Sequence, residues 1–177
     1  MLSNEDKSLC LQIAREAIAE RLGIINTIIP CPEAQIFREK FGMFVTLTNK
    51  GKLRGCIGYV IPHKMLYQSI IDLARSAAFS DNRFKKITKE EFEEIHIEIS
   101  ILSPLYEIKE YSEIVVGRDG LLVQHPHGSG LLLPQVATKY NWSVQEFLKE
   151  TCHKAGLHES YLSDKVMKIY RFEAEIF

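Results

Sequence analysis

Apolar residues in two parts of the chain recur at the three- and four-residue spacing of an amphipathic helix. One stripe covers residues 3–22, and a second follows Pro62 and continues to about residue 79. Capping signals mark the starts of three predicted helices: Ser3 with Asp6, Thr88 with Glu91, and Ser143 with Glu146. The pattern therefore predicts long helices over residues 3–22 and 62–79, and shorter ones over residues 88–94 and 143–155.

Elsewhere apolar and polar residues alternate, as they do in strands that are buried on one face. Residues 44–48 and 53–58 are joined by an Asn-Lys-Gly turn, which is a strong signal for a β-hairpin. Residues 95–101 hold four isoleucines that alternate with polar residues, and residues 167–176 form a last strand-like run. Between these two runs, short strands separated by glycine-containing turns are predicted at residues 113–116, 120–125 and 129–133.

This layout predicts an α+β fold with two lobes. The larger lobe, residues 1–103 plus 164–177, would contain an antiparallel sheet with flanking helices and would hold both termini. The smaller inserted lobe, residues 104–163, would contain a three-stranded antiparallel sheet with helices. A length of 177 residues suits this arrangement, since it allows one domain or two small lobes.

Composition narrows the possible functions. The chain is 46% apolar and 25% charged, which is typical of a globular protein, and its formal charge of −1 argues against nucleic acid as a partner. No run approaches the ~20 apolar residues that span a bilayer, and the acidic start lacks the features of a secretion signal. We therefore expect a cytoplasmic protein.

The four cysteines, Cys10, Cys31, Cys56 and Cys152, form no Cys-x-x-Cys pair, which favours free thiols in a reducing compartment over a disulfide scaffold or a zinc site. The spacing of His125 and His127 resembles that of metal ligands, but the pair falls on a glycine-rich turn without evident companions. We interpret it as a solvated turn, and we predict no metal and no cofactor.

The segment Leu53-Arg54-Gly55-Cys56-Ile57-Gly58 combines a guanidinium, a thiol and two glycines in one strand. Strand alternation places Arg54, Cys56 and Gly58 on one face. Two residues rise about 6.5 Å along a strand, so one ligand could contact both Arg54 and Cys56. Gly55 and Gly58 indicate a bulge or a close approach by another group.

Two interpretations of Cys56 stand side by side. A guanidinium nearby favours the thiolate, which is the nucleophilic form, and His96 on a neighbouring strand could act as its base. Alternatively Cys56 is a small packed residue, because free cysteine is among the most buried residue types. The polar face of the isoleucine strand, with His96, Glu98 and Ser100, either faces solvent or lines a cleft shared with Cys56.

A buried Arg54 would need a carboxylate partner, and Glu98 and Asp81 are the candidates from sequence context. Arg54, Asp81 and Arg83 together allow two interpretations. They bind an anionic or carboxylate-bearing ligand, since guanidinium groups suit planar oxyanions, or they form a salt-bridge network that ties the Arg54–Cys56 strand to the turn after the second long helix.

The same segment resembles the signature of the AMMECR family, the A component of the AmmeMemoRadiSam system. The likeness continues through Ala77–Phe84, Glu98–Pro104, Gly130–Val136, Lys154–Leu157 and Tyr170–Glu173. The resemblance implies a fold of two antiparallel-sheet lobes, with the signature strand facing a cleft between them. It also suggests a link to Memo-type proteins and radical-SAM enzymes.

Two functions follow as expectations. In the first, the cleft binds a small-molecule substrate, with Arg54 and Cys56 as catalytic residues and Gly55, Gly58, Asp81, Arg83, His96 and Glu98 as ligand-binding residues. The chain would then work as an enzyme subunit beside Memo-type and radical-SAM partners, because it has no iron–sulfur cysteine cluster of its own. In the second, the chain is a non-catalytic module that docks a partner protein. Thiol reactivity of Cys56 separates the two.

Overall fold

The structure, a computed structural model, describes residues 2–177 and divides into two compact units. The first unit comprises the chain up to Ile101 together with Glu175–Phe177, and the second comprises Leu102–Ala174. The second unit therefore reaches further along the chain than the predicted boundary at residue 163. It does so because the C-terminal strand pairs with two strands of that unit.

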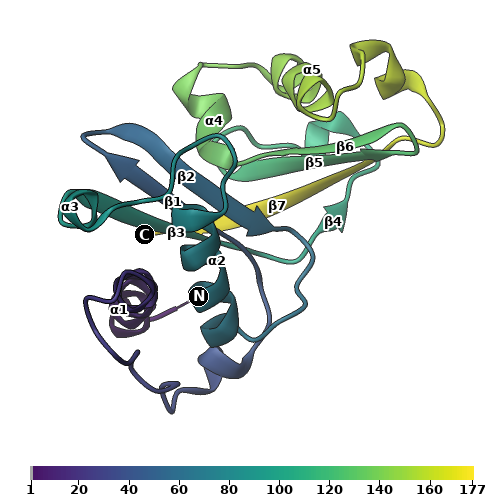
Figure 1. Cartoon of the computed structure of the whole chain (residues 1–177). Helices are drawn as coiled ribbons and strands as arrows, with labels where there is room; N and C mark the ends of the chain where they lie inside the picture. The colour runs from purple at the N-terminus through teal and green to yellow at the C-terminus, as the bar shows by residue number, and fades with distance from the viewer. Residues whose placement is uncertain (1) are drawn as a thin grey trace. The chain divides into compact units, whose positions relative to one another are not determined.

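The first unit contains a sheet with helices on one face. Its strands are β1 (Gly42–Asn49), β2 (Lys52–Tyr59) and β3 (Ile95–Leu102, which ends at the boundary), in the order β2-β1-β3. Its helices are α1 (Asn4–Arg21), α2 (Leu66–Phe79) and α3 (Lys89–Phe92), with a 3-10 helix at Gln35–Arg38. α1 packs on α2, and α2 packs on β1 and β2 (Figure 1). The apolar faces of these elements form one core.

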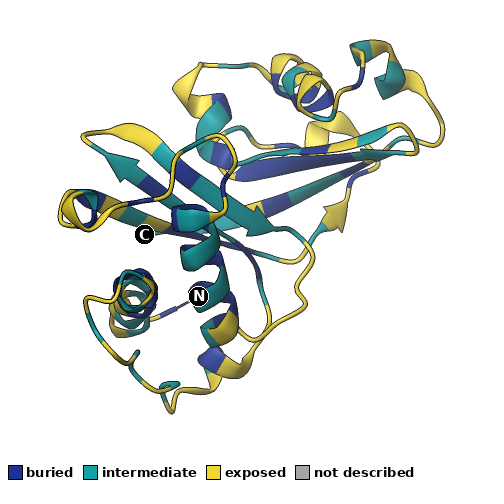
Figure 2. Ribbon diagram, in the orientation of Figure 1, coloured by how far each residue is buried: buried dark blue, intermediate teal, exposed yellow. Residues whose placement is uncertain are grey.

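Local signals set the limits of these elements. The capping box of Ser3 and Asp6 begins α1, and that of Thr88 and Glu91 begins α3, as predicted. The hairpin turn places Lys50 and Gly51 at φ 50° and 75°, the left-handed pair of a type I′ turn. Figure 2 shows this turn as exposed. α2, however, begins at Leu66 and not directly after Pro62 as predicted, and the intervening residues 62–65 are exposed.

The second unit contains β4 (Tyr106–Glu107), β5 (Asp119–His125), β6 (Gly128–Leu132) and β7 (Lys168–Ile176, whose last two residues belong to the first unit). β5 pairs with β6 and β7, and β4 also pairs with β7, all antiparallel. Two helices, α4 (Pro134–Lys139) and α5 (Val144–Lys154), accompany these strands, and α5 packs against β5 and β6 (Figure 1). Further 3-10 helices cover Tyr111–Glu113 and Glu159–Ser163.

The strand predicted at residues 113–116 is wrong, because a 3-10 helix and a turn occupy this segment. Side chains satisfy its backbone donors. Glu113 accepts hydrogen bonds from the N–H groups of Lys109 and Glu110, and Asp119 accepts one from Val115 at 2.8 Å. Such local bonds compete with the ladder of a sheet and favour turns.

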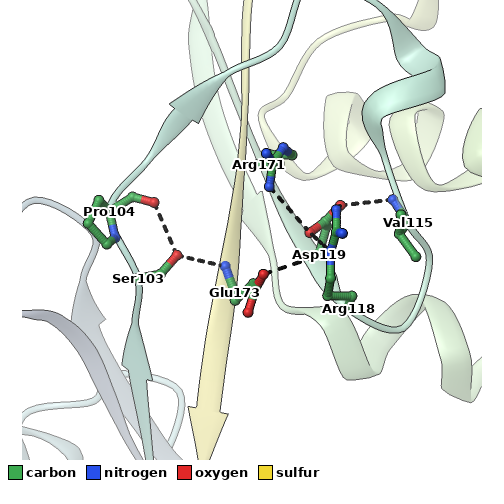
Figure 3. A network of polar contacts seen from close by, with 7 residues as sticks. All are labelled: Ser103, Pro104, Val115, Arg118, Asp119, Arg171 and Glu173. Atoms are coloured by element: carbon green, nitrogen blue, oxygen red, sulfur yellow. Dashed lines mark hydrogen bonds and ion pairs between the residues drawn. The ribbon is translucent and has the colours of Figure 1, made fainter. Parts of the chain in front are cut away.

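Asp119 also organises a polar network of the second unit (Figure 3). The carboxylate is fully buried, pairs with Arg118 at 2.8 Å and lies 4.0 Å from Arg171. Burial acts to raise its pKa, but the bonds from Arg118 and Val115 outweigh that effect, so its pKa lies below the usual value. Glu173 extends the network, since its N–H donates to the Ser103 hydroxyl at 2.9 Å. The network ties β5 to β7.

The interpretation of His125 as part of a solvated turn is also wrong. Its side chain is 3% exposed, and its ring lies edge-on to Tyr161 with centroids 4.7 Å apart. The Nε2 atom is 3.4 Å from an oxygen of Asp164, while His127 remains exposed. Packing between β5 and the segment near residue 161 buries the ring, a contact that the local sequence does not indicate.

Candidate functional site

The Arg54–Gly58 segment lies in β2, the terminal strand of the order β2-β1-β3 in the first unit. Its register with β1 shifts at one point, where Leu47 pairs with Gly55 but Thr48 pairs with Leu53. Arg54 therefore has no cross-strand partner and is the extra residue of a β-bulge. A bulge re-aims the side chain it carries. It also moves Leu53 to the face of Thr48, so the strict alternation predicted for this strand is broken.

The Arg54 side chain reaches α3. Its Nε donates to one oxygen of Glu91 at 2.9 Å and its Nη2 to the other at 3.0 Å, and the side chain is 14% exposed. The predicted partners, Glu98 and Asp81, are both wrong. Glu91 is available because the capping box of α3 already fixes its carboxylate, which accepts the Thr88 N–H at 3.2 Å. The hydrogen bonds from Arg54 hold the pKa of Glu91 below its ordinary value.

Asp81 and Arg83 cover the free edge of β2 at Cys56. The Cys56 N–H donates to Asp81 Oδ2 at 2.9 Å, and the Cys56 carbonyl accepts from Arg83 Nη2 at 3.1 Å. Arg83 also binds both oxygens of Asp81, at 2.9 and 2.7 Å. The pair thus replaces a neighbouring strand at this residue. These are the contacts of the salt-bridge interpretation, which ties the signature strand to the turn after α2.

The ion pair with Arg83 strongly favours the ionised form of the Asp81 carboxylate. Asp81 is 7% exposed, and the hydrogen bond from Arg83 holds its pKa far below the usual range, with help from the Cys56 N–H and against the effect of burial. The pKa of Arg83 is raised in turn, first by its hydrogen bond to Asp81 and then by the charge of that carboxylate, against the effect of burial. Asp81 is therefore ionised at neutral pH.

The Cys56 sulfur lies on the face of the hairpin that carries Thr46. Because the N–H and carbonyl of Cys56 point away from β1, Thr46 and Cys56 form a non-hydrogen-bonded pair, in which side chains come closest. The Thr46 hydroxyl oxygen is 3.3 Å from the sulfur, and both residues are half-buried. Among residues 2–177 this hydroxyl is the one side-chain hydrogen-bond partner of the thiol.

Gly55 and Gly58 are explained by close backbone approach. A Cβ atom on Gly55 would lie 2.1 Å from the Ala77 carbonyl oxygen, so β2 and α2 touch at this point. A Cβ atom on Gly58 would lie 2.2 Å from the Phe44 ring and 2.3 Å from the Met43 carbonyl oxygen. Both glycines are therefore required by packing in the first unit. Their predicted role in ligand binding stays a prediction.

The polar side of β3 divides into exposed and buried parts. His96 and Glu98 are exposed, and in the described part of the chain no hydrogen bond joins either side chain to Cys56 or Arg54. Ser100 is fully buried, and its hydroxyl has no partner within residues 2–177. The exposure of His96 and Glu98 fits a solvent-facing surface. The cleft that these residues were expected to line stays a prediction.

The same residues give no metal centre of the usual kind. Within residues 2–177 no group of three or more His, Cys, Asp or Glu side chains lies close enough together to hold a metal ion.

None of the helices within residues 2–177 has the length and apolar character to cross a membrane.

Comparison with known proteins decides the family. The model of the AMMECR1 family matches residues 11–177. The chain belongs to the AMMECR1 family. A protein of Methanothermobacter thermautotrophicus is 43% identical over 183 residues, covering 99% of this chain and 95% of the relative. A protein of Methanocaldococcus jannaschii is 41% identical over 186 residues, covering 100% of this chain and 92% of the relative.

Solved structures agree. The crystal structure of an uncharacterized protein from Pyrococcus horikoshii matches this AMMECR1-family chain with a TM-score of 0.89 at 38% identity, covering 99% of this chain and 92% of the other. The resemblance found in the sequence and the predicted α+β fold are thereby confirmed. The family match carries no activity, ligand or partner with it.

Sequence reasoning missed three contributors to the site of this AMMECR1-family chain: Thr46, Lys86 and Glu91. Thr46 could have been found from the hairpin register, since it is the residue opposite Cys56. Glu91 was assigned to helix capping alone, although its carboxylate serves both the cap and Arg54. Lys86 contributes its carbonyl oxygen, 3.3 Å from Arg54 Nη2, and backbone groups give no signal in a sequence.

Proposed function

We propose that this AMMECR1-family chain is a ligand-binding subunit, and that its ligand contacts the surface formed by Thr46, Cys56 and Arg83, here called the Cys56 face. The observation that carries the proposal is the position of Arg83. Its guanidinium is fixed to the Cys56 carbonyl and to Asp81, while its side chain remains 55% exposed. A guanidinium that is fixed in position but accessible, next to a half-buried thiol, is suited to bind a polar small molecule.

The donors of Arg83 define the ligand chemistry. Nε and Nη2 are engaged by Asp81 and Cys56, whereas Nη1 donates no hydrogen bond to any other residue in the range 2–177. The two N–H groups of Nη1 can donate to a carboxylate or carbonyl oxygen. Because Asp81 neutralises the guanidinium, the contact favours hydrogen-bond acceptors over highly charged anions. The thiol and the Thr46 hydroxyl would meet the uncharged part of such a ligand.

Rigidity supports binding at this face. The N–H and carbonyl of Cys56 are held by Asp81 and Arg83, and on the other side of β2 the Tyr59 hydroxyl bonds to Ser69 of α2. Ordering a flexible surface costs free energy on association, about 0.5–1.5 kcal/mol for each immobilised side chain. A strand that is already fixed from its edge and from its helix side avoids that cost.

Nucleophilic catalysis by Cys56 is less well supported than binding. An activated thiol needs an unneutralised cation or a base close to the sulfur. Here Arg54 pairs with Glu91, Arg83 pairs with Asp81, and the sulfur has a neutral hydroxyl as its partner. We therefore propose that Cys56 contacts the ligand, and that covalent chemistry comes from partner chains. The family resemblance suggests Memo-type and radical-SAM proteins for that role.

The alternative function is a non-catalytic module that docks a partner protein. One common mode, addition of a strand to a sheet edge, needs free backbone groups along that edge. At Cys56 these groups of β2 are already occupied by Asp81 and Arg83. The structure thus offers less support for this mode than for a small ligand on the Cys56 face.

Thiol reactivity tests the assigned role of Cys56. The native protein is treated with iodoacetamide at pH 7, and mass spectrometry follows Cys56 and Cys31, which are both half-buried and free. We expect Cys56 to react no faster than Cys31. A rate for Cys56 about tenfold higher than that for Cys31 would contradict the binding role and support catalysis, because the thiolate is the reactive form of cysteine.

Ligand retention tests the binding itself. The protein is incubated with a small-molecule extract of cells, passed through gel filtration, and the retained compounds are identified by mass spectrometry. Cys56→Met adds bulk to the Cys56 face, and Cys31→Met is the matched control. We expect a compound that the wild type and the control retain and that Cys56→Met retains about tenfold less, a loss of about 1.4 kcal/mol. Equal retention by all three proteins, or none by the wild type, would refute the proposal.

A further inference from the structure

A polar hollow of the first unit, whose lining includes no residue of the Cys56 face, lies between the C-terminal ends of α1 and α2. These helices pack side by side (Figure 1), and the hollow between their ends has a volume of about 390 Å³. Its charged lining consists of Glu20 and Arg21 from α1, Arg75 from α2 and Lys86 from the following loop. The volume falls in the lower range of small-molecule sites.

The charge of this hollow is opposite to that of the whole chain. Three cations and one carboxylate give a formal charge of +2, whereas the chain carries −1. The C-terminal ends of α1 and α2 each contribute roughly half a negative charge, which leaves about +1. The cations therefore exceed what the two helix ends neutralise. An anion would find a favourable field here.

The donors are arranged around one fixed guanidinium. Arg75 Nη2 is bound to Glu20 at 2.7 Å and its Nε points to the Ala17 carbonyl at 3.4 Å, so the side chain bridges the two helices. Arg21 and Lys86 have no ion-pair partner within the part of the chain that the structure describes. One held cation with two uncommitted ones is a suitable arrangement for a multivalent oxyanion.

The remaining lining specifies the ligand further. Ser76 and Ser80 add hydroxyl groups, and Phe79 adds a half-buried aromatic ring. Hydroxyls complete the hydrogen bonds of a phosphate group, while the ring offers an apolar surface to the organic part of a ligand. We infer that this hollow binds a phosphate monoester of a small organic molecule, with its phosphate between Arg21, Arg75 and Lys86.

The site is connected to the signature strand through Lys86. The carbonyl oxygen of Lys86 accepts a hydrogen bond from Arg54 Nη2 at 3.3 Å, and the same residue lines the hollow. A bound phosphate would hold the segment that contains Lys86 in place. Binding should therefore change the environment of Arg54 as well as that of the residues in the hollow.

Phenyl phosphate is the probe, with inorganic phosphate and benzoate as the comparison arms at equal ionic strength. Isothermal titration calorimetry measures affinity, and amide NMR shifts show where the probe binds. We expect phenyl phosphate to bind with a dissociation constant of about 1 mM or tighter, phosphate more weakly, and benzoate most weakly. The largest shifts should fall at Ser76, Ser80 and Lys86, with smaller ones at Arg54.

The double variant Arg21→Gln, Lys86→Gln should weaken phenyl phosphate binding at least about tenfold, which corresponds to about 1.4 kcal/mol. Both side chains are exposed, so the fold should persist, and the thermal midpoint checks this. Lys168→Gln, an exposed lysine of β7, is the matched control and should bind as the wild type does. Equal affinity of the double variant and the control, or shifts confined to the second unit, would overturn the inference. Retained binding of benzoate at the affinity of phenyl phosphate would refute the phosphate assignment.

Discussion

Removal of the Asp81 carboxylate is the most informative perturbation of the signature strand. In Asp81→Ala the backbone N–H groups of Cys56 and Arg83 lose their acceptor, as do two nitrogens of the Arg83 guanidinium. An unsatisfied buried donor costs about 1–3 kcal/mol. Arg83 is 55% exposed and can turn to water, so the backbone donors dominate the loss. We expect the free energy of unfolding to fall by about 2–4 kcal/mol.

Urea denaturation at pH 7 measures this loss. The matched control is Asp72→Ala, because Asp72 is also an ion-paired aspartate of the first unit but is 47% exposed, with Lys64 as its partner. That variant should change the stability much less, since exposed pairs contribute little. Amide hydrogen exchange gives a second readout, as the Cys56 N–H should lose protection in Asp81→Ala. A loss no greater than the control's, with unchanged Cys56 protection, would refute the role of Asp81 as the cover of the β2 edge.

The pH dependence of this difference has a defined sign. The pKa of Asp81 is lowered in the folded protein, first by its bond with Arg83, so the unfolded chain binds the proton more tightly. The contribution of Asp81 is therefore complete above the unfolded pKa of about 3.9 and is lost as the pH falls towards the folded value. The stability difference between wild type and Asp81→Ala should be constant from about pH 5 to 8 and shrink below about pH 4.

Further predictions concern other parts of the chain. Gly55→Ala should lower the free energy of unfolding in urea by about 1–3 kcal/mol, because its methyl group would overlap the α2 backbone. Arg54→Met should destabilise the protein at pH 7, and the loss measured in urea should diminish below about pH 4, because the pKa of Glu91 is held down by Arg54. Asp119→Ala should cost about 1–3 kcal/mol in the same assay, since the Val115 N–H loses its acceptor, whereas the Arg118 side chain, which is 45% exposed, can turn to water. Burial raises the pKa of the Cys10 thiol to about 12, so mass spectrometry should find Cys10 unmodified by iodoacetamide until the protein is denatured.

Each of these expectations has a contrary result. A Gly55→Ala variant as stable as wild type would show that β2 and α2 can separate without cost. A loss in Arg54→Met that stays the same at low pH would indicate lost packing instead of a lost ion pair. Wild-type stability of Asp119→Ala would remove the network as the tie between β5 and β7. Alkylation of native Cys10 would show that α1 opens readily.

Much of the secondary structure follows from residues that are close together in the sequence. The capping boxes at Ser3, Thr88 and Ser143, and the two-residue turn at Lys50 and Gly51, involve groups no more than three positions apart. Their geometry is fixed once the local backbone is fixed. Alternation and helical spacing then identified the buried faces, and the resemblance in the signature segment identified the family. Gly55 was predicted to mark a close approach, which the structure shows at α2.

The ion pair of Arg54 and the hydrogen bond that covers the β2 edge could not be predicted from such local patterns. Arg54 and Glu91 are 37 positions apart, and Cys56 and Asp81 are 25 apart, so their meeting depends on the path of the intervening loop. The bulge at Arg54 also breaks the alternation from which its direction was predicted. A carboxylate gives the same local signal whether it caps a helix, pairs with a guanidinium or covers a sheet edge. The sequence alone therefore determined most of the helices and strands, their core faces and the family, whereas the tertiary structure decided which charges meet, because long-range electrostatic contacts are selected by packing and not by local pattern.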